Sequence, residues 1–141
     1  MRFMVLVKAN EDTEAGAMPS EAELTAMGRY NEELVKAGVL LAGEGLHPSS
    51  NGVRIAFDGD KRTVIDGPFA ETKELLAGFW LLEVGSREEI IEWVKRAPME
   101  SGELEIRQVF TEDDFGDAMS PELKEHEAKL RAQVEEQQRG K

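Results

Sequence analysis

Two segments, RFMVLVK at residues 2–8 and GFWLLEV at residues 78–84, are apolar on both faces when they are read as β-strands. In the first segment the odd positions hold Phe and Val, while the even positions include Met and Leu. Strands of this kind lie in the middle of a sheet and are covered on both sides. The pattern therefore predicts a sheet whose two faces both need a covering layer.

Two amphipathic helices are expected to supply one of these layers. The first should begin at a capping box, Ser20 with Glu23, and stop at Gly38. The second should begin at another capping box, Ser86 with Glu89, and end before Pro98. The apolar row of the first helix is Leu24, Met27, Leu34 and Val35, with Asn31 in the same row.

The remaining strands complete an α+β pattern. Residues 39–44 and 104–109 read as strands, and residues 53–57 and 62–65 read as a half-buried hairpin around the turn at 58–60. The order is strand, helix, strand, hairpin, strand, helix, strand. This order predicts a ferredoxin-like sheet with helices on one face and an inserted β-hairpin.

The second face of the sheet has two candidate covers. A second copy of the sheet is the simpler one, and it predicts a homodimer packed sheet to sheet with closed two-fold symmetry. The alternative is a monomer in which the hairpin and the C-terminal helix fold over that face.

The last part of the chain is expected to be an appended helix. Ser120 and Pro121 are typical of an N-cap and a first helical residue. The following apolar stripe is narrow, and residues 112–141 hold nine acidic and five basic residues. We therefore expect one α+β domain at residues 1–111 and an acidic helical extension at residues 112–141.

Composition excludes several classes of function. The 141 residues hold 29 acidic and 17 basic side chains, a formal charge of −12, and no cysteine. Nucleic-acid binding needs clustered Lys and Arg, and anionic membranes repel an acidic chain, so neither partner is expected. The chain offers no thiol chemistry and no run of about 20 apolar residues. A cytoplasmic protein with a small-molecule or protein partner is the expectation.

The densest polar cluster is DGPFAETKE at residues 66–74. Asp66 ends a strand, and the Gly-Pro turn after it restricts the backbone. Such a rigid backbone would hold the carboxylate in place, as a general base requires. Phe69 could anchor the loop in the core. Glu71 and Lys73 would add a second carboxylate and a cation. The alternative is ordinary turn chemistry, in which Asp66 accepts hydrogen bonds from loop N–H groups.

A second cluster lies at residues 43–48, GEGLHP. Glu44 stands on an otherwise apolar strand, so it should face a polar pocket or pair with a cation such as Arg107 or Arg54. His47 is the one histidine of the expected α+β domain, and histidine is the residue type most often used for proton transfer. Two distant histidines and no cysteine give no metal site, and the glycine pattern lacks a dinucleotide motif. Neither a metal nor a cofactor is expected.

The 66–74 segment resembles the signature of the DGPF proteins, a branch of the YCII-related domain family. The resemblance also covers the opening strand, residues 43–46, 78–80 and 105–107, and spans about residues 1–111. It implies a dimeric α-β barrel of ferredoxin-like protomers with a polar pocket near the dimer interface. A smaller branch has been proposed to use a His–Asp pair, and a related member acts in the breakdown of chlorinated aromatics. Asp66 matches the signature aspartate, but no histidine precedes His47, where the smaller branch has its own.

These observations favour a small-molecule enzyme that transfers a proton without a cofactor, by elimination or isomerisation. Asp66 would be the base or an electrostatic anchor, with Glu44 and His47 as proton-transfer partners. Arg107 or Lys73 would hold an anionic substrate group, with Glu71 beside them. The alternative is a non-catalytic metabolite-binding or regulatory dimeric module. A third interpretation makes the signature a structural loop that locks the dimer.

Overall fold

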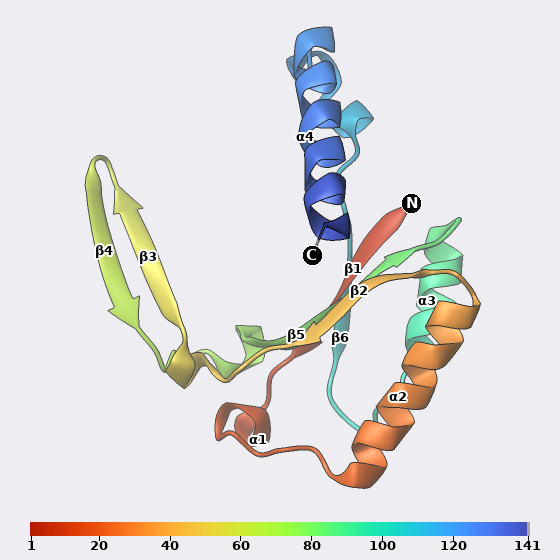
Figure 1. The fold of residues 1–141 in the computed structure, drawn as a ribbon. Coiled ribbons are helices and arrows are strands. Elements are labelled where there is room, and N and C mark those ends of the chain that lie inside the picture. The colour runs from red at the N-terminus through yellow and green to blue at the C-terminus, as the bar shows by residue number, and fades with distance from the viewer. Residues whose placement is uncertain (141) are drawn as a thin grey trace. The chain divides into compact units, whose positions relative to one another are not determined.

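The computed structural model describes residues 1–140, without the side chain of Lys73. Four antiparallel strands form a sheet in the order β2-β5-β1-β6, and α2 and α3 lie on one side of it (Figure 1). The predicted α+β fold with a ferredoxin-like sheet is confirmed. The elements of this layer pair are β1 (Arg2–Lys8), α2 (Glu21–Lys36), β2 (Leu40–Gly45), β5 (Leu76–Glu83), α3 (Arg87–Lys95) and β6 (Leu104–Gln108).

The core fills the space between the helices and one face of the sheet. The central strands are β1 and β5, the two segments that are apolar on both faces. Tyr30 ties the two helices together, because its hydroxyl donates a hydrogen bond of 2.7 Å to the Trp93 carbonyl. Trp80 donates from its ring nitrogen to the Asn31 side chain at 2.9 Å, so its polar atom is satisfied. The buried cluster is Phe3, Val5, Tyr30, Leu34, Val39, Trp80, Leu82, Val84 and Ile90.

The helix boundaries follow the capping signals with one difference. Ser20 and Glu23 form the predicted reciprocal capping box at the start of α2. At the start of α3, Ser86 accepts from the Glu89 N–H as predicted, but the Glu89 carboxylate accepts from the Gly85 N–H. Only one of the two hydrogen bonds of the second capping box therefore forms. The Glu89 carboxylate accepts from the residue before the N-cap instead of from the N-cap itself.

The buried side of α2 differs from the predicted row. Leu34 is fully buried, whereas Leu24 and Val35 are 59% and 62% exposed. At 100° per residue, Leu24 and Val35 lie roughly a quarter turn from the line that contains Tyr30 and Leu34. The spacing of apolar residues in the sequence predicted a broad apolar row on α2, but the sheet contacts only one edge of that row.

The segment between β1 and α2 contains a short helix, α1 (Glu11–Glu14). Asn10 is its N-cap. The Asn10 side chain accepts from the Thr13 N–H, and the Thr13 hydroxyl oxygen accepts from the Asn10 N–H. This reciprocal pairing gives a four-residue segment enough local order to form a turn of helix.

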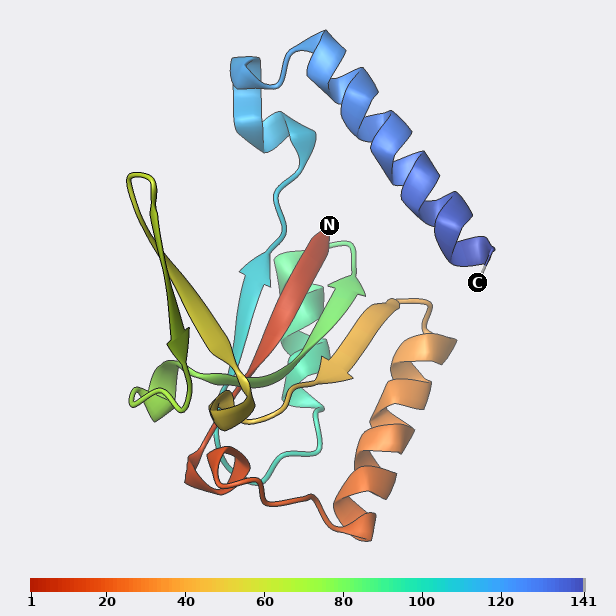
Figure 2. The same cartoon turned by 60° about the vertical axis from the view of Figure 1, so that its left-hand side comes forward.

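The inserted hairpin consists of β3 (Val53–Asp58) and β4 (Lys61–Asp66). Gly59, with φ 58°, supplies the left-handed residue of the turn. The hairpin rises from the side of the sheet opposite the helices (Figures 1 and 2). The expectation that it is half-buried is wrong, because every residue of both strands is exposed. Among the described residues, the hairpin therefore leaves the second face of the sheet uncovered.

Contacts divide the chain into Met1–Val109 and Phe110–Lys141. The second unit holds a kinked 3-10 segment, η3 (Glu112–Ala118), and α4 (Pro121–Arg139), with Ser120 as the predicted N-cap. Its Phe110 and Phe115 rings are 5.1 Å apart. The division at residues 111 and 112 into a domain and an extension stays a prediction. Within residues 1–140, no helix combines the length and the apolar character that crossing a membrane requires.

Substitution of Leu34 by Ala should lower the free energy of unfolding by about 2–5 kcal/mol, because it opens a cavity between α2 and the sheet. Leu24→Ala on the same helix is the matched control, and it should cost less than about 1 kcal/mol because Leu24 already contacts water. Urea unfolding followed by Trp fluorescence measures both. Equal losses would show that α2 buries its broad apolar row rather than one edge.

Candidate functional site

The face of the sheet away from the helices is built in rows. Paired residues on neighbouring strands point to the same side, so one row across all four strands contains Glu44, Phe79, Leu6 and Glu105. Phe79 and Leu6 are half-buried, whereas Glu44 at the β2 edge is exposed. A carboxylate thus stands at each end of an apolar row.

The next row contains Ala42, Leu81, Met4 and Arg107. Together, the four central side chains of the two rows form what we call the apolar floor: Met4, Leu6, Phe79 and Leu81. All four are half-buried. The floor is therefore an apolar surface with charged side chains on both of its edges.

At the β6 edge, Glu105 is held by two cations. The Lys8 ammonium lies 3.2 Å from the Glu105 carboxylate, and the Arg107 guanidinium lies 3.3 Å from it. The hydrogen bond between Lys8 and Glu105 raises the pKa of Lys8 and lowers the pKa of Glu105. Lys8 also lies 3.8 Å from Glu74. This edge is a paired charge network, with both groups kept ionised at neutral pH.

The predicted pairing of Glu44 with Arg107 or Arg54 is not present among the described residues. Glu44 and Arg107 lie on opposite edge strands, about 14 Å apart at the spacing of neighbouring strands. Arg107 contacts Glu105, and Arg54 lies 3.9 Å from Glu71. Glu44 therefore stands at the β2 edge, away from the cations expected to hold it.

Glu44 and His47 lie at and just after the end of β2, whereas Asp66 lies at the base of the hairpin. His47 is in the loop after β2, and its ring nitrogen Nδ1 is 3.1 Å from the side-chain nitrogen of Asn51. Asp66 ends β4, where the register places it opposite Val53, and it is exposed. Among the described residues, no hydrogen bond joins His47 to Asp66. The chain thus brings Glu44, His47 and the hairpin base to one corner of the sheet without forming a His–Asp pair.

The rest of the 66–74 segment packs on the hairpin base. The Arg54 guanidinium lies 3.8 Å from the centre of the Phe69 ring and pairs with Glu71. The sequence suggested that Phe69 anchors the loop in the core. This is wrong, because Phe69 is half-buried against the hairpin and does not belong to the core cluster. The Lys73 side chain lies outside the described residues, so its predicted role stays a prediction.

A latch, which the sequence analysis missed, holds this segment. The Glu14 carboxylate accepts from both the backbone N–H of Ser49, at 2.9 Å, and the Ser49 hydroxyl. The Ser49 hydroxyl oxygen accepts in turn from the Phe69 N–H at 3.0 Å. The Ser49 hydroxyl, followed by its N–H, lowers the pKa of Glu14. The available signal was the pair Asn10 and Thr13, which starts α1 and so positions Glu14.

The backbone geometry explains why residue 67 of the signature is a glycine. Its N–H donates to the Gly52 carbonyl at 2.9 Å, and the following Gly67-Pro68 bond is cis. A Cβ at Gly67 would overlap the carbonyl oxygen of Ser49. Ser49 lies in the 3-10 turn η1 (Ser49–Asn51), and a second such turn, η2 (Thr72–Glu74), ends the segment. The signature thus closes tightly on the loop after β2.

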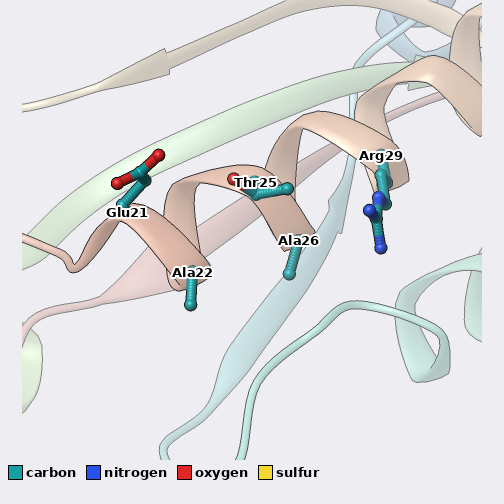
Figure 3. A pocket seen from close by; sticks show the side chains of 5 residues that line it. All are labelled: Glu21, Ala22, Thr25, Ala26 and Arg29. Atoms are coloured by element: carbon teal, nitrogen blue, oxygen red, sulfur yellow. The ribbon is translucent and has the colours of Figure 1, made fainter.

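A surface hollow or a metal-binding cluster could also mark a site. Among the described residues, neither feature points to the predicted site residues. A shallow hollow on α2 is lined by Glu21, Ala22, Thr25, Ala26 and Arg29, all from one helix (Figure 3). Among the described side chains, no three of His, Asp or Glu gather closely enough to hold a metal ion. The open face and its β2 corner remain the candidate site.

Gly67→Ala should destabilise the protein by about 1–3 kcal/mol, because the added methyl group forces the backbone of η1 away. Gly45→Ala is the control, since a Cβ there meets nothing within 4 Å. Chemical denaturation measures both free energies of unfolding. A Gly67→Ala variant as stable as Gly45→Ala would contradict the close approach to Ser49.

Ser49→Ala should raise the pKa of Glu14 toward its ordinary value, because the hydroxyl that donates to Glu14 is lost. The hydrogen bond from the Phe69 N–H to that hydroxyl oxygen is lost as well. Because the pKa of Glu14 is lower in the folded protein than its ordinary value of 4.5, the ionised carboxylate stabilises the folded state at pH values above 4.5. This stabilisation is lost as the pH falls through the folded-state pKa. Titration of carboxyl carbons by NMR measures the pKa. Ser50→Ala is the neighbouring control and should leave it unchanged; a shift of the same size there would refute the latch.

Comparisons with known proteins found a similar curated protein and a similar solved structure. An uncharacterised protein of Rhizobium meliloti (strain 1021) is 29% identical over 112 residues, which are 76% of this chain and 90% of that protein. A solved structure is similar over 80% of this chain and 98% of its own, with 14% identity and a TM-score of 0.40. It is 5-chloro-2-hydroxyhydroquinone dehydrochlorinase from Burkholderia phenoliruptrix AC1100, in complex with 2,5-dihydroxybenzoquinone.

The YCII-related domain matches residues 1–113 of the chain. This range includes the whole sheet, both covering helices, the hairpin and the 66–74 segment. The match confirms the family that the signature suggested, while the DGPF branch within it stays a resemblance. The chain belongs to the YCII-related domain family.

Proposed function

We propose that the protein is a small-molecule enzyme that transfers a proton without a cofactor on the open face of its sheet. The supporting observation is the apolar floor with Glu44 at one edge and Arg107 at the other. An apolar part of a substrate would lie on Phe79 and Leu6, which are half-buried and face away from the core. An anionic group at its far end would meet the guanidinium of Arg107.

Glu44 is suited to act as the base of this reaction. Its carboxylate stands in the same row as Phe79, so a bound substrate would present carbon atoms to it. The base takes a proton from carbon, and the electron pair of the broken C–H bond forms a double bond. In an elimination the leaving group departs with its own electron pair; in an isomerisation the proton returns to another carbon.

The other predicted residues have supporting roles in the proposal. Asp66 and His47 lie at the same corner as Glu44 and would act as the electrostatic anchor and the proton-transfer partner. Glu71, with Lys73, would contact polar groups of the substrate at the hairpin base. This arrangement rests on where the strands and loops place the residues, since the side chains of Glu44, His47 and Asp66 are exposed in a single copy.

The same proposal includes a homodimer packed sheet to sheet. Proton abstraction from carbon is favoured by a site that excludes water. One copy leaves the apolar floor open, and a second copy related by a two-fold axis would close it. The pocket would then lie between two floors, with a carboxylate supplied by each copy.

Hydrogen–deuterium exchange into substrate tests the chemistry without knowledge of the product. The protein is incubated in D₂O with a panel of small ketones and halogenated phenols, and loss of carbon-bound proton signals is followed by NMR. The wild-type protein should exchange at least one member of the panel. Glu44→Gln should slow that exchange by about 100-fold or more, because the base is lost. Asp66→Asn should slow it while leaving the fold intact.

Glu32→Gln is the matched control, because Glu32 is an equally exposed carboxylate on α2. It should exchange at the wild-type rate. Equal rates in Glu44→Gln and the wild type would refute Glu44 as the base. Equal stability but unchanged rate in Asp66→Asn would reduce Asp66 to a turn residue.

A non-catalytic metabolite-binding module is the second candidate function. The observation that favours it is the contact of His47 with Asn51, which leaves Asp66 without a histidine partner among the described residues. For such a module, a member of the same panel would shift the methyl resonances of Met4 and Leu81 and show no exchange. Deletion of residues 112–141 would then weaken binding of a protein partner and leave ligand affinity unchanged.

A further inference from the structure

The hairpin carries an apolar face that one copy of the chain leaves in water. The register places Val53, Ile55 and Phe57 of β3 on one side, together with Val64, which pairs with Ile55. Their exposed fractions are 58%, 52%, 71% and 66%, respectively. We call these four residues the arm face. Isolated exposed apolar residues are common, but four adjacent ones on one strand pair form a patch.

The arm face needs a cover for physical reasons. A two-stranded hairpin alone is marginally stable in water, and stability requires further strands or packing against another layer. Among the described residues, β3 and β4 pair with each other and have no extensive contact with another element. Only the hairpin base is fixed, through the Gly67–Gly52 hydrogen bond and the Arg54–Glu71 pair. Among the described residues, the strands beyond that base therefore pack mainly on each other.

We propose that the hairpin is an intermolecular arm, whose arm face packs on a second copy of this chain beside the open sheet face. This inference rests on the proposed homodimer and adds a second element to its interface. In a closed pair each copy supplies one arm and receives one. The hairpin rises on the side of the sheet opposite α2 and α3 (Figure 1), and the register puts the apolar floor on that side too, so the arm and the floor would meet the same partner.

Charge supports a second copy as the occupant. The chain has a net charge of −12, whereas residues 53–66 hold three basic and three acidic side chains and are neutral. The arm can therefore approach an acidic copy without net repulsion. Arg62 reinforces this, because its guanidinium lies 4.6 Å from the centre of the Phe57 ring on the arm face. Asp58 and Asp60 balance Lys61 and Arg62, so the tip of the arm is neutral as well.

The area is also sufficient. Taking about 100 Å² for a large apolar side chain, the four residues expose on the order of 250 Å² in each copy. Two arms and the equal area that they cover would bury about 1,000 Å², close to the lower end of specific interfaces, before the sheet faces are added. Seating the arm would also shield Asp66, which faces Val53 at its base.

Sedimentation equilibrium of the full chain tests the arm. Ile55→Thr/Phe57→Thr removes the largest side chains of the arm face and keeps β-branched residues suited to a strand. It should weaken dimerisation at least 100-fold. Leu24→Gln/Val35→Gln is the control, because it removes two apolar residues of similar exposure from α2. This control should dimerise within threefold of the wild type.

Hydrogen exchange of the wild-type protein supplies a readout that does not depend on any variant folding. Amides of β3 and β4 should be protected at concentrations where the dimer forms and should lose protection on dilution to monomer. Protection that persists in the monomer would overturn the proposal, because the chain would then cover its own arm. A dimer with unprotected hairpin amides would also overturn it, since the arm would then await a different partner.

The failures of the two proposals can be told apart. A dimer of unchanged affinity in the arm variant would refute the arm and leave the sheet-to-sheet dimer standing. A wild-type protein that stays monomeric at 100-fold the protein concentration of the activity assays would refute both the arm and the dimer. Absence of deuterium exchange into any substrate would count against the enzyme alone, because association is measured without substrate.

Discussion

The sheet has two apolar faces, and within residues 1–109 the long helices α2 and α3 cover one of them. β1 and β5 place Phe3, Val5, Trp80 and Leu82 under α2 and α3, where they form the core. The same two strands place Met4, Leu6, Phe79 and Leu81 on the opposite face, where they are half-buried. Exposed apolar patches of this kind often mark binding surfaces, and we propose that this face binds a ligand, a second copy or both.

The 66–74 segment combines a structural and a chemical interpretation. Gly67 and Phe69 are explained by packing, because one closes on the Ser49 carbonyl and the other completes the Glu14–Ser49 latch. Asp66 has no such explanation among the described contacts, and it stands at the base of the exposed hairpin. The structural interpretation therefore accounts for Gly67 and Phe69, and the chemical role of Asp66 stays a proposal.

Sequence predicted the architecture well and the exposed parts less well. Strand periodicity and the Ser20 and Ser120 caps identified the central strands and the helix starts, because these signals are local. The buried side of α2 could not be predicted, since which edge of a broad apolar row meets the sheet depends on tertiary packing. The same applies to the Glu14–Ser49 pair, whose partners are 35 residues apart. The alternating pattern of the hairpin suggested half-burial, although in one chain every residue of its two strands is exposed.

Charge connects the proposed interface with the acidity of the chain. The open face carries three basic residues, Arg2, Lys8 and Arg107, and three acidic ones, Glu44, Glu83 and Glu105. The hairpin is balanced in the same way. The acidic excess lies elsewhere, on α1, the helix surfaces and the C-terminal unit, where it favours solubility. Two copies that meet through neutral, apolar surfaces hold their excess charge outside the contact, where salt at physiological strength screens repulsion beyond about 8 Å. Acidity and self-association are thus compatible in this chain because they occupy different surfaces.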